Sequence, residues 1–493
     1  MTFAERCGVA DTGRAGACEA AVALVEQREL ELVRIGWCDT HGVLRGKTVV
    51  ASAFESILRD GVSLVSTILL KDTSDRTAYR VFEAQDAAAL AGFRYANNLV
   101  LLPDPASLHV LPWAARTGWL RADAWFEDGT AVPYDTRRIL VHALERLAAA
   151  GYRLVCGLEV EFHVYRLTGG ERDPSLDPTR AAWPGEPPAV TMIHPGYNLL
   201  AENWADMADE PLRIVQHTAQ GLGLPLRSLE IELGPSQVEA VFDAEDALEA
   251  ADHMVLFRNG VRQALRRAGY HASFVCRPPF PNAMASGWHL HQSLVERATG
   301  ANAFVRTAPA EGIGEGDARR TLSDVGAGWL GGLLAHGRGM AALCTPTING
   351  FGRFRPNAMA PQTVTWGRDN RGAMLRVLGA CGDEATRIEN RIGEPMANPY
   401  LYMAAQVHAG LDGLERGLDP GPEAAAPYAS AGHALPASLG ESLDALAADA
   451  ALERGFGPAV IDWYARVKRS EVSRHDQADD REAWQAREYF SRF

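Results

Sequence analysis

The residues of this sequence that could do chemistry are, first of all, carboxylates at alternating positions. Glu159 and Glu161 stand two positions apart in the segment Gly157–Tyr165. Side chains two apart share one face of a β-strand, so both carboxylates would lie on the same side of a sheet. Like charges at that spacing repel, so the pair needs a solvated face or cations between them. The segment therefore predicts either a solvated edge strand or a site for hard divalent cations.

A second pair of carboxylates brackets a turn. Glu232 precedes the dipeptide Gly234-Pro235, and Glu239 follows it. Gly and Pro together mark a change of chain direction, so the two carboxylates can converge across a hairpin-like bend. Taken alone, this pattern fits a surface hairpin better than a site.

Two histidines alternate in the same way. His289 and His291 would share one strand face. A single histidine is usually structural, whereas two of them beside a carboxylate-rich sheet could bind a cation or a phosphate.

Arginines are the fourth feature, because they concentrate between residues 353 and 391. Their forked guanidinium groups bind carboxylates and phosphates through paired hydrogen bonds, although any one of them can instead pair with a surface acid. Alternation places Arg387, Glu389 and Arg391 on one face. The run consists of Arg353, Arg355, Arg368, Arg371, Arg376, Arg387 and Arg391.

Together these motifs predict one site, in which carboxylates and a histidine bind two or more divalent cations while arginines bind anions. This inventory suits phosphoryl transfer, because cations bridge the phosphates and arginines neutralise developing charge without a nucleophilic side chain. The sequence carries no Walker A loop, no G-x-S-x-G and no G-x-G-x-x-G after a predicted strand. The common nucleotide-binding and hydrolase signatures are therefore absent.

Length and composition limit the class of protein. The 493 residues exceed the usual size of one hydrophobic core, so we expect two domains. The net charge of −14 disfavours nucleic acid as a partner. Without an apolar stretch of about 18 residues or a signal-peptide pattern, no membrane association is expected. Seven dispersed cysteines without a C-x-x-C pair are typical of reduced thiols in the cytoplasm.

The elements that must position these residues predict an α+β protein. In the N-terminal part, residues 30–50 and 98–113 indicate strands, and a helix is expected over Cys18–Leu32. Further on, Asp135 can cap a helix that ends at Gly151.

The same helix-then-strand unit recurs along the rest of the chain. The first helix is followed by a predicted strand over Tyr152–Tyr165, and a second helix, capped by Asp243 and ended by Gly269, precedes a predicted strand over His271–Cys276. Two more segments complete the prediction, namely a surface connection over residues 419–440 and a charged helical tail over Ser470–Phe493. The predicted domains are residues 1–131 and 132–493.

In combination, these motifs resemble the glutamine synthetase family over about residues 25–470. The segment R-P-P-F-x3-M-A-S-G-W-H-L-H-Q-S resembles the family's ATP-site signature, and G-L-E-V-E-F resembles its paired metal-ligand strand. The other matched blocks are E-L-G-P-S-Q-V-E, G-R-F-R-P, N-R-G-A-M-L-R, R-I-E-N-R-x5-A-N-P-Y-L and D-T-H-G-V-L-R-G-K. The resemblance implies an N-terminal β-grasp domain and a large catalytic domain with a curved antiparallel sheet flanked by helices.

The resemblance also implies a ligand set. One Mg²⁺ or Mn²⁺ ion would be bound by Glu161, Glu232 and Glu239, and a second by Glu159, His289 and Glu389, in a site holding two or three ions. ATP would be contacted by His291, Ser293, Arg376 and Arg387. L-glutamate would be held by Arg353, Arg391 and the loop at Ala285, and the catalytic residues would be Arg371, Arg353 and Asp72. The family forms hexameric rings or dodecamers with active sites between subunits.

Three departures from the family pattern concern the attacking nucleophile. The family's ammonium-binding Asp has only Asp72 as a substitute, its flap Glu is replaced by Met359, and its Asn-Gly before the signature histidine becomes Met284-Ala285. Losing a carboxylate weakens a cation site, and Met adapts to an organic group. The sequence thus resembles the amine-utilising branch, such as the γ-glutamylpolyamine, γ-glutamylmethylamide and γ-glutamylanilide synthetases.

That resemblance implies ATP-dependent ligation of an organic amine to the γ-carboxylate of L-glutamate through γ-glutamyl phosphate, in amine catabolism. A small alkylamine or an aromatic amine such as aniline is favoured, in a pocket lined by Met359 and Trp288. Two alternatives stay open. One is an ammonia-dependent glutamine synthetase, in which Asp72 would bind ammonium, and the other is a non-catalytic structural member of the family.

Overall fold

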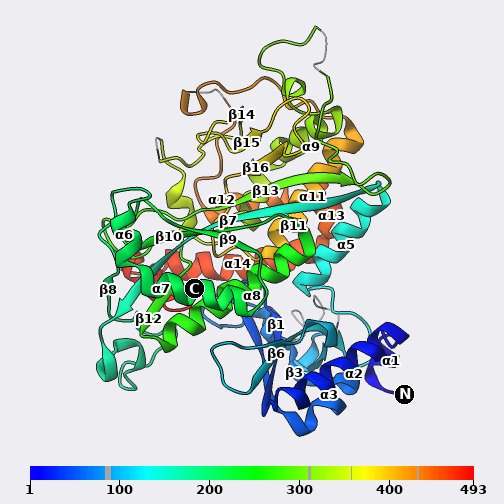
Figure 1. Ribbon diagram of the computed structural model, residues 1–493, viewed down its shortest axis with the longest axis vertical. Helices are drawn as coiled ribbons and strands as arrows, with labels where there is room; N and C mark the ends of the chain where they lie inside the picture. Colours follow the sequence, from blue (N-terminus) through cyan, green and yellow to red (C-terminus); the bar gives the residue numbers. More distant parts are fainter. Residues whose placement is uncertain (84–89, 91, 309–311, 357, 430–431) are drawn as a thin grey trace.

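The computed structural model describes residues 1–493 except 84–89, 91, 309–311, 357 and 430–431. A smaller sheet with the N-terminal helices beside it lies at one end of the molecule, and a larger sheet covered by helices makes up the rest (Figure 1). Helices and strands are thus mixed, as the sequence predicts. Among the described residues, no helix has both the length and the apolar character needed to span a bilayer.

The smaller sheet is built from the N-terminal part of the chain. Its strands run in the order β2-β1-β6-β4-β3 with β5 beside β6, and β1 and β6 are parallel while the other pairs are antiparallel. The strands are β1 (Leu32–Cys38), β2 (Leu44–Val50), β3 (Val62–Val65), β4 (Asn98–Pro103), β5 (His109–Val110) and β6 (Thr117–Phe126). The accompanying helices are α1 (Phe3–Arg6), α2 (Thr12–Gln27) and α3 (Phe54–Asp60). The strands predicted in residues 30–50 are confirmed, and the β-grasp assignment stays a prediction.

The helix predicted over Cys18–Leu32 is displaced. Helix α2 begins at Thr12, because the side chain of Asp11 accepts a hydrogen bond from the Arg14 amide and caps it. It ends at Gln27, since Glu29 takes a positive φ of 49° and Leu32 already belongs to β1. The apolar residues after Gln27 therefore belong to a strand rather than to the helix.

The larger sheet follows the order β14-β15-β16-β13-β7-β10-β9, and β8, β11 and β12 also pair with β7. The long strand β7 is therefore its centre. Every described pair is antiparallel except β14 with β15, which departs from the purely antiparallel expectation. The strands are β7 (Tyr152–Leu167), β8 (Val190–Met192), β9 (Leu226–Ile231), β10 (Gln237–Phe242), β11 (Glu245–Asp246), β12 (Tyr270–Ser273), β13 (Trp288–Glu296), β14 (Trp366–Arg368), β15 (Leu375–Leu378) and β16 (Arg387–Asn390).

Helices cover this sheet (Figure 1). Asp135 caps α5 by accepting the amides of Arg137 and Arg138, and Gly151 follows the helix with a φ of 94°, as predicted. The helices are α5 (Thr136–Ala149), α6 (Glu202–Met207), α7 (Asp209–Gly221), α8 (Ala247–Arg267), α9 (Asp324–Ala335), α10 (Gly337–Cys344), α11 (Pro399–Arg416), α12 (Leu439–Ala447), α13 (Ala450–Phe456), α14 (Pro458–Asp476) and α15 (Arg481–Gln485).

Two boundaries differ from the prediction. Helix α8 begins at Ala247 after Asp246, not after Asp243, because residues 245 and 246 first pair with β7 as β11. The strand predicted over His271–Cys276 is β12, which ends at Ser273. Residues 419–440 form a largely irregular connection, of which 430–431 lie outside the described residues.

The predicted C-terminal tail is helical but is packed into the protein. Tyr489 is fully buried, and the Glu488 carboxylate accepts hydrogen bonds from Thr73 and Ser74, in the segment after β3. The end of the chain thus fixes that N-terminal segment. The division into residues 1–131 and 132–493 stays a prediction.

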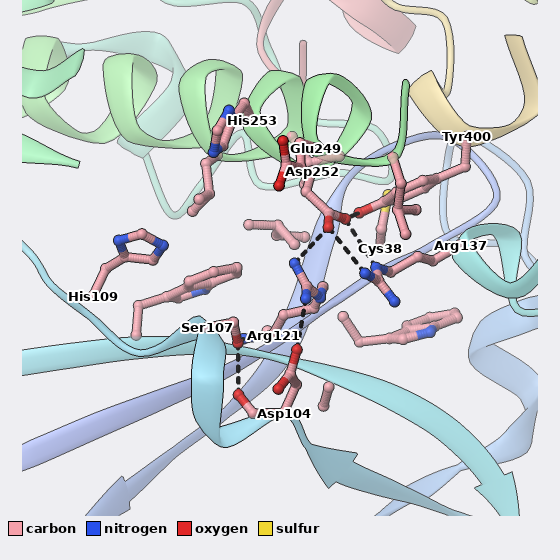
Figure 2. Close-up of a pocket in the computed structure, with 18 of the residues that line it drawn as sticks. Cys38, Asp104, Ser107, His109, Arg121, Arg137, Glu249, Asp252, His253 and Tyr400 are labelled. Atoms are coloured by element: carbon pink, nitrogen blue, oxygen red, sulfur yellow. Dashed lines mark hydrogen bonds and ion pairs between the residues drawn. The ribbon is translucent and has the colours of Figure 1, made fainter. Parts of the chain in front are cut away.

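A partly buried ionic network ties a strand of the smaller sheet to helices that cover the larger one. Figure 2 shows Asp252 of α8 facing Arg121 of β6 and Arg137 of α5. Its carboxylate accepts hydrogen bonds from Arg121 at 2.6 Å, from Arg137 at 2.9 Å and from the Tyr400 hydroxyl at 2.7 Å. A cavity of about 350 Å³ lies beside this network. The network holds β6, α5, α8 and α11 at fixed mutual positions.

Candidate active site

The carboxylates and histidines singled out in the sequence meet on one face of the larger sheet. Glu159 of β7 lies directly opposite His289 of β13, and Glu161 lies opposite Glu239 of β10. The intervening residue Val160 is fully buried, as the alternation predicts. The central position of β7 therefore collects side chains from strands far apart in the sequence.

His289 occupies the centre of this group. Its Nδ1 lies 3.6 Å from Glu159 Oε2 and 3.7 Å from Glu389 Oε1, and its Nε2 lies 3.9 Å from Glu161 Oε1. Within the described residues, two triads bring their ligand atoms within 4.8 Å of one another, Glu159–His289–Glu389 and Glu161–Glu239–His289. We call these two triads the carboxylate–histidine cluster.

The cluster differs from the expected ligand sets at Glu232. The resemblance implies Glu232 as the third partner of Glu161 and Glu239, but His289 completes that triad. The Oε2 atom of Glu232 instead accepts the amide of Leu233 at 3.1 Å. Glu232 nevertheless lies close enough for its charge to raise the pKa of Glu161.

Burial and the mutual repulsion of carboxylates shift the pKa values of the residues in the cluster. Burial and the neighbouring Glu232 raise the pKa of Glu161 to about 7, and burial followed by the charge of Glu161 raises the pKa of Glu239. Burial would also raise the pKa of Glu159, but hydrogen bonds with His289 and His291 lower it overall. Burial and the charge of Arg391 lower the pKa of His289 to about 4, so its imidazole is neutral near pH 7.

These residues fit divalent cations. Carboxylate oxygens and a neutral imidazole are ligands of Mg²⁺ and Mn²⁺. Burial and mutual repulsion raise the pKa values of Glu161 and Glu239, so a cation bound between them would favour their ionised forms. The chemistry of the donor set thus matches hard divalent cations without selecting one of them.

Three of the predicted arginines surround the cluster. Arg353 approaches His289 Nε2 to 3.3 Å, Arg376 donates to Glu389 at 3.1 Å, and Arg391 also donates to Glu389. Arg371, by contrast, is exposed, and its charge lowers the pKa of Asp369 only as a lesser cause behind the hydrogen bond and charge of Arg376.

Gly287 makes the approach of Arg353 feasible. A Cβ atom on Gly287 would lie 2.5 Å from an Arg353 guanidinium nitrogen and 3.0 Å from His289 Nε2. The Gly in the A-S-G-W-H segment is therefore required by the close packing of Arg353 against His289.

An open cleft of about 1320 Å³ lies beside the Glu159 side of the cluster. Three of the residues predicted to contact ATP, His291, Ser293 and Arg387, line it together with Glu159. His291 Nε2 lies 3.0 Å from Glu159 Oε1, and Arg387 Nε donates to His291 Nδ1 at 3.0 Å. The cleft is large enough for a nucleotide, whereas Arg376 lies outside its lining.

Ala285, expected to contact glutamate, and Met359, expected to contact the amine, take different positions relative to the cluster. Ala285 lies next to the cluster, where its carbonyl oxygen accepts from Gln237 at 3.3 Å. Met359 is 52 % exposed, has a positive φ of 50°, and accepts a hydrogen bond from Arg391 through its carbonyl oxygen. The Met359 side chain is thus an exposed apolar group at the rim of the site.

The structure contradicts the placement of Trp288 in the amine pocket. Trp288 is fully buried and packs edge-on against Tyr402 of α11, with ring centroids 4.9 Å apart. It faces the helix side of the sheet because it alternates with His289, whose side chain faces the cluster. Trp288 is therefore a core residue beneath the site.

Asp72 also does not join the cluster. Its carboxylate is completely buried, and Oδ2 accepts from Arg474 at 2.9 Å and from Ser470 at 3.1 Å. Its other oxygen accepts the amides of Ser74 and Arg76, each at 3.0 Å. Both oxygens of the buried Asp72 carboxylate are thus occupied by four hydrogen bonds, one of which is also its ion pair with Arg474, and not by an ammonium site.

One residue at the site escaped the sequence analysis. Gln237 is 2 % exposed, and its Nε2 donates to Glu161 Oε2 at 3.1 Å. The available signal was its alternation with Glu239 in Gln237-Val-Glu239, which places both side chains on one face of β10.

Comparison with known proteins places these observations in a family. The profile described as "Glutamine synthetase, catalytic domain" matches residues 133–489. The chain is 37% identical over 492 residues to a gamma-glutamylanilide synthase of Acinetobacter sp, covering 96% of each chain. It is 31% identical over 474 residues to a gamma-glutamylethanolamide synthetase of Streptomyces coelicolor, covering 95% of each.

A solved structure has the same fold. The structure described as apo GmaS without ligand superposes with a TM-score of 0.74 at 29% sequence identity, covering 94% of this chain and 98% of that one. The profile match and this superposition agree on a mixed helix-and-sheet fold with a curved central sheet.

Proposed function

Because the chain belongs to the glutamine synthetase family, whose enzymes are carbon–nitrogen ligases, we propose that it joins an organic amine to the γ-carboxylate of L-glutamate and converts ATP to ADP and phosphate. The observation that carries this proposal is the pair of triads that share His289 at the edge of a nucleotide-sized cleft. A site of this kind can activate a phosphate on one side and hold an acidic substrate on the other.

The two triads divide the proposed work. Glu159, His289 and Glu389 would hold the cation that faces the nucleotide cleft. Glu161 and Glu239, with Glu232 beside them, would hold the cation on the glutamate side. Bound there, Mg²⁺ or Mn²⁺ supplies charge neutralisation for the phosphates and for the substrate carboxylate.

The protein's own side chains perform the remaining tasks in this proposal. His291, Ser293 and Arg387 bind ATP in the cleft, and Arg376 orients Glu389 from outside it. Arg353 and Arg391 bind carboxylate oxygens of glutamate, and Arg371 approaches the transferred phosphate. Fixing both substrates in this way turns a reaction between two anions into one between neighbouring, neutralised groups.

The covalent chemistry follows from the poor leaving ability of a carboxylate oxygen. The γ-carboxylate attacks the γ-phosphorus of ATP, which forms γ-glutamyl phosphate and releases ADP. The amine nitrogen then attacks the acyl carbon, phosphate leaves with the C–O electron pair, and the nitrogen loses a proton to give the amide. Excluding water from the site protects the acyl phosphate from hydrolysis.

An apolar amine is the nucleophile that we propose. Met359 supplies an exposed apolar side chain at the rim, and both relatives compared above are named for amide products of organic amines. Ammonia is disfavoured because the four hydrogen bonds of Asp72 occupy the carboxylate that would bind ammonium. We further propose a cytoplasmic enzyme of amine catabolism that assembles as a hexameric ring or dodecamer with active sites between subunits.

The decisive experiment is a phosphate-release assay with ATP, L-glutamate and Mg²⁺ or Mn²⁺, run against aniline, isopropylamine, methylamine, ethanolamine, a polyamine and ammonia. We expect an alkylamine or aromatic amine to give the highest kcat/KM, with the γ-glutamyl amide identified by mass spectrometry. A higher kcat/KM for ammonia than for every amine would contradict the proposal. Absence of activity with all of them would favour a non-catalytic member of the family.

A further inference from the structure

The side chain of Gln237 forms hydrogen bonds both with the cluster and with two loops beside it. Gln237 begins β10, and its Nε2 lies within hydrogen-bond distance of Glu161 Oε2 and Ser286 Oγ, each at 3.1 Å, and of the Ala285 carbonyl oxygen at 3.3 Å. Its Oε1 accepts the Gly234 amide at 2.9 Å. One buried amide thus contacts β7, the loop before β13 and the turn before β10.

The contact with Glu161 is specific to one carboxylate oxygen. Oε2 of Glu161 accepts from Gln237 and also from the Gly287 amide at 2.9 Å. Oε1 belongs to the side that faces His289, at 3.9 Å from Nε2. A carboxylate fixed through one oxygen presents the other in a defined direction, as a cation ligand must.

The backbone around Gln237 is built to allow this contact. Gln237 pairs with His163, so Glu161 is its diagonal neighbour on the adjacent strand and within reach of a long side chain. A Cβ on Gly234 would lie 2.6 Å from Gln237 Oε1, so the turn can pass this close only with glycine. The Gly and the Gln of the G-P-S-Q-V-E motif therefore act together.

We infer that Gln237 is a positioning residue, whose amide holds Glu161 Oε1 toward a cation and fixes the Ala285 loop beside it. This inference rests on the proposed function, because it assigns Glu161 to the cation on the glutamate side. It makes cation binding and glutamate binding depend on the same amide group. ATP binding does not depend on it, since His291 and Arg387 lie on the other side of the cluster.

The test compares Gln237→Glu with the unaltered full-length protein. The substitution keeps the shape of the side chain, removes both N–H donors and places a carboxylate against Glu161. Loss of such a partner of a metal ligand typically costs about 10- to 100-fold in metal affinity. We expect the Kd for Mn²⁺, titrated calorimetrically in the absence of substrates, to rise by this factor, and hydrogen exchange at residues 284–287 to become faster.

Kinetic measurements separate positioning from a general loss of structure. The KM for glutamate should rise with Mn²⁺ saturating, whereas the KM for ATP and the melting temperature should change little. Gln216→Glu on the exposed face of α7 adds the same charge away from these contacts. It should leave the Kd for Mn²⁺, the hydrogen exchange at residues 284–287, both KM values and the melting temperature unchanged. If Gln237→Glu does not fold, Gln237→Met removes the hydrogen bonds without adding charge and should show the same rise in the Kd for Mn²⁺.

The outcomes distinguish this inference from the proposed function. Equal Kd values for Mn²⁺ in the variant and the unaltered protein, with equal KM values for glutamate, would overturn the positioning role alone. Equal increases in the KM for ATP and in the KM for glutamate would also overturn the positioning role, in favour of a purely structural one. Failure of the unaltered protein to bind Mn²⁺ would instead refute the proposed function.

Discussion

His289 and Glu159 lie directly opposite each other on β13 and β7, with His289 Nδ1 3.6 Å from Glu159 Oε2. This pairing places one imidazole between the two triads, because the Nε2 atom of the same ring faces Glu161. Burial and Arg391 lower the pKa of His289, so the ring has a free lone pair at neutral pH. His289 is therefore the residue whose loss should affect both halves of the site.

The first prediction concerns His289→Ala. We expect the stoichiometry of Mn²⁺ binding to fall and ligase activity to drop by at least about 100-fold, because changing an outer partner of a metal ligand alone costs about 10- to 100-fold. Calorimetric titration with Mn²⁺ and the phosphate-release assay measure the two effects. The exposed His217→Ala on α7 serves as the control and should change neither. Unaltered Mn²⁺ stoichiometry in His289→Ala would rule out the central role of this ring.

The second prediction concerns pH and cation removal. Burial raises the pKa of Glu161 to about 7 from 4.5 and also raises that of Glu239, so the folded state binds these protons more tightly than the unfolded state. The contribution of these two carboxyls to the stability of the cation-free protein should therefore fall as the pH rises from about 4.5 to about 7, whereas buried histidines with lowered pKa values, such as His289, contribute in the opposite sense. Added Mn²⁺ should restore stability most strongly at the upper end of this range.

Melting curves at several pH values, with chelator or with Mn²⁺, measure this effect. Glu239→Gln removes one of the two carboxyls whose pKa is raised. The chelated variant should therefore lose less stability with rising pH than the chelated unaltered protein. Glu159 and Glu389, whose pKa values are lowered, stabilise the fold above their ordinary range and lose this effect only as the pH falls below it. An identical change in stability with pH for chelated Glu239→Gln and for the chelated unaltered protein would contradict the prediction.

The local sequence pattern predicted which side chains share a face, and this part of the site is confirmed. Period-2 alternation placed Glu159 with Glu161 and His289 with His291, and the structure has both pairs on the cluster side. It could not reveal that β7 lies between β10 and β13, since strand order depends on non-local pairing. The same alternation, applied to Trp288, would have placed it on the opposite face.

The positions of Asp72 and Gln237 could not be predicted from local sequence patterns, because both depend on contacts with other parts of the fold. Asp72 is neutralised by Arg474, which lies 402 positions away in the sequence. The role of Gln237 depends on its reach across a strand boundary to Glu161. The family resemblance supplied the ligand set, but it assigned Glu232 where His289 completes the triad.

The third prediction concerns Asp72→Ala. The substitution leaves Arg474 with only one of its two acidic partners, Glu488. It also removes the carboxylate oxygen that accepts the backbone amides of Ser74 and Arg76. Breaking a buried ion pair from one side typically costs about 3–5 kcal/mol, so we expect a loss of stability of that order in urea unfolding. The KM for the amine or ammonia should change little in the folded fraction. A large rise in the KM for ammonia without loss of stability would restore Asp72 as an ammonium site.

The last prediction concerns Met359→Glu. Met359 offers an apolar side chain at the rim, 52 % exposed, and a carboxylate there would favour a small cation such as ammonium over an apolar amine. We expect the ratio of kcat/KM for the preferred amine to that for ammonia to fall by at least about 10-fold, the lower range for discrimination by an apolar pocket. Met207→Glu on α6 changes an equally exposed methionine, 56 % exposed, away from the cluster and should leave the ratio unchanged. The same ratio in Met359→Glu and in the unaltered protein would remove Met359 from the amine pocket.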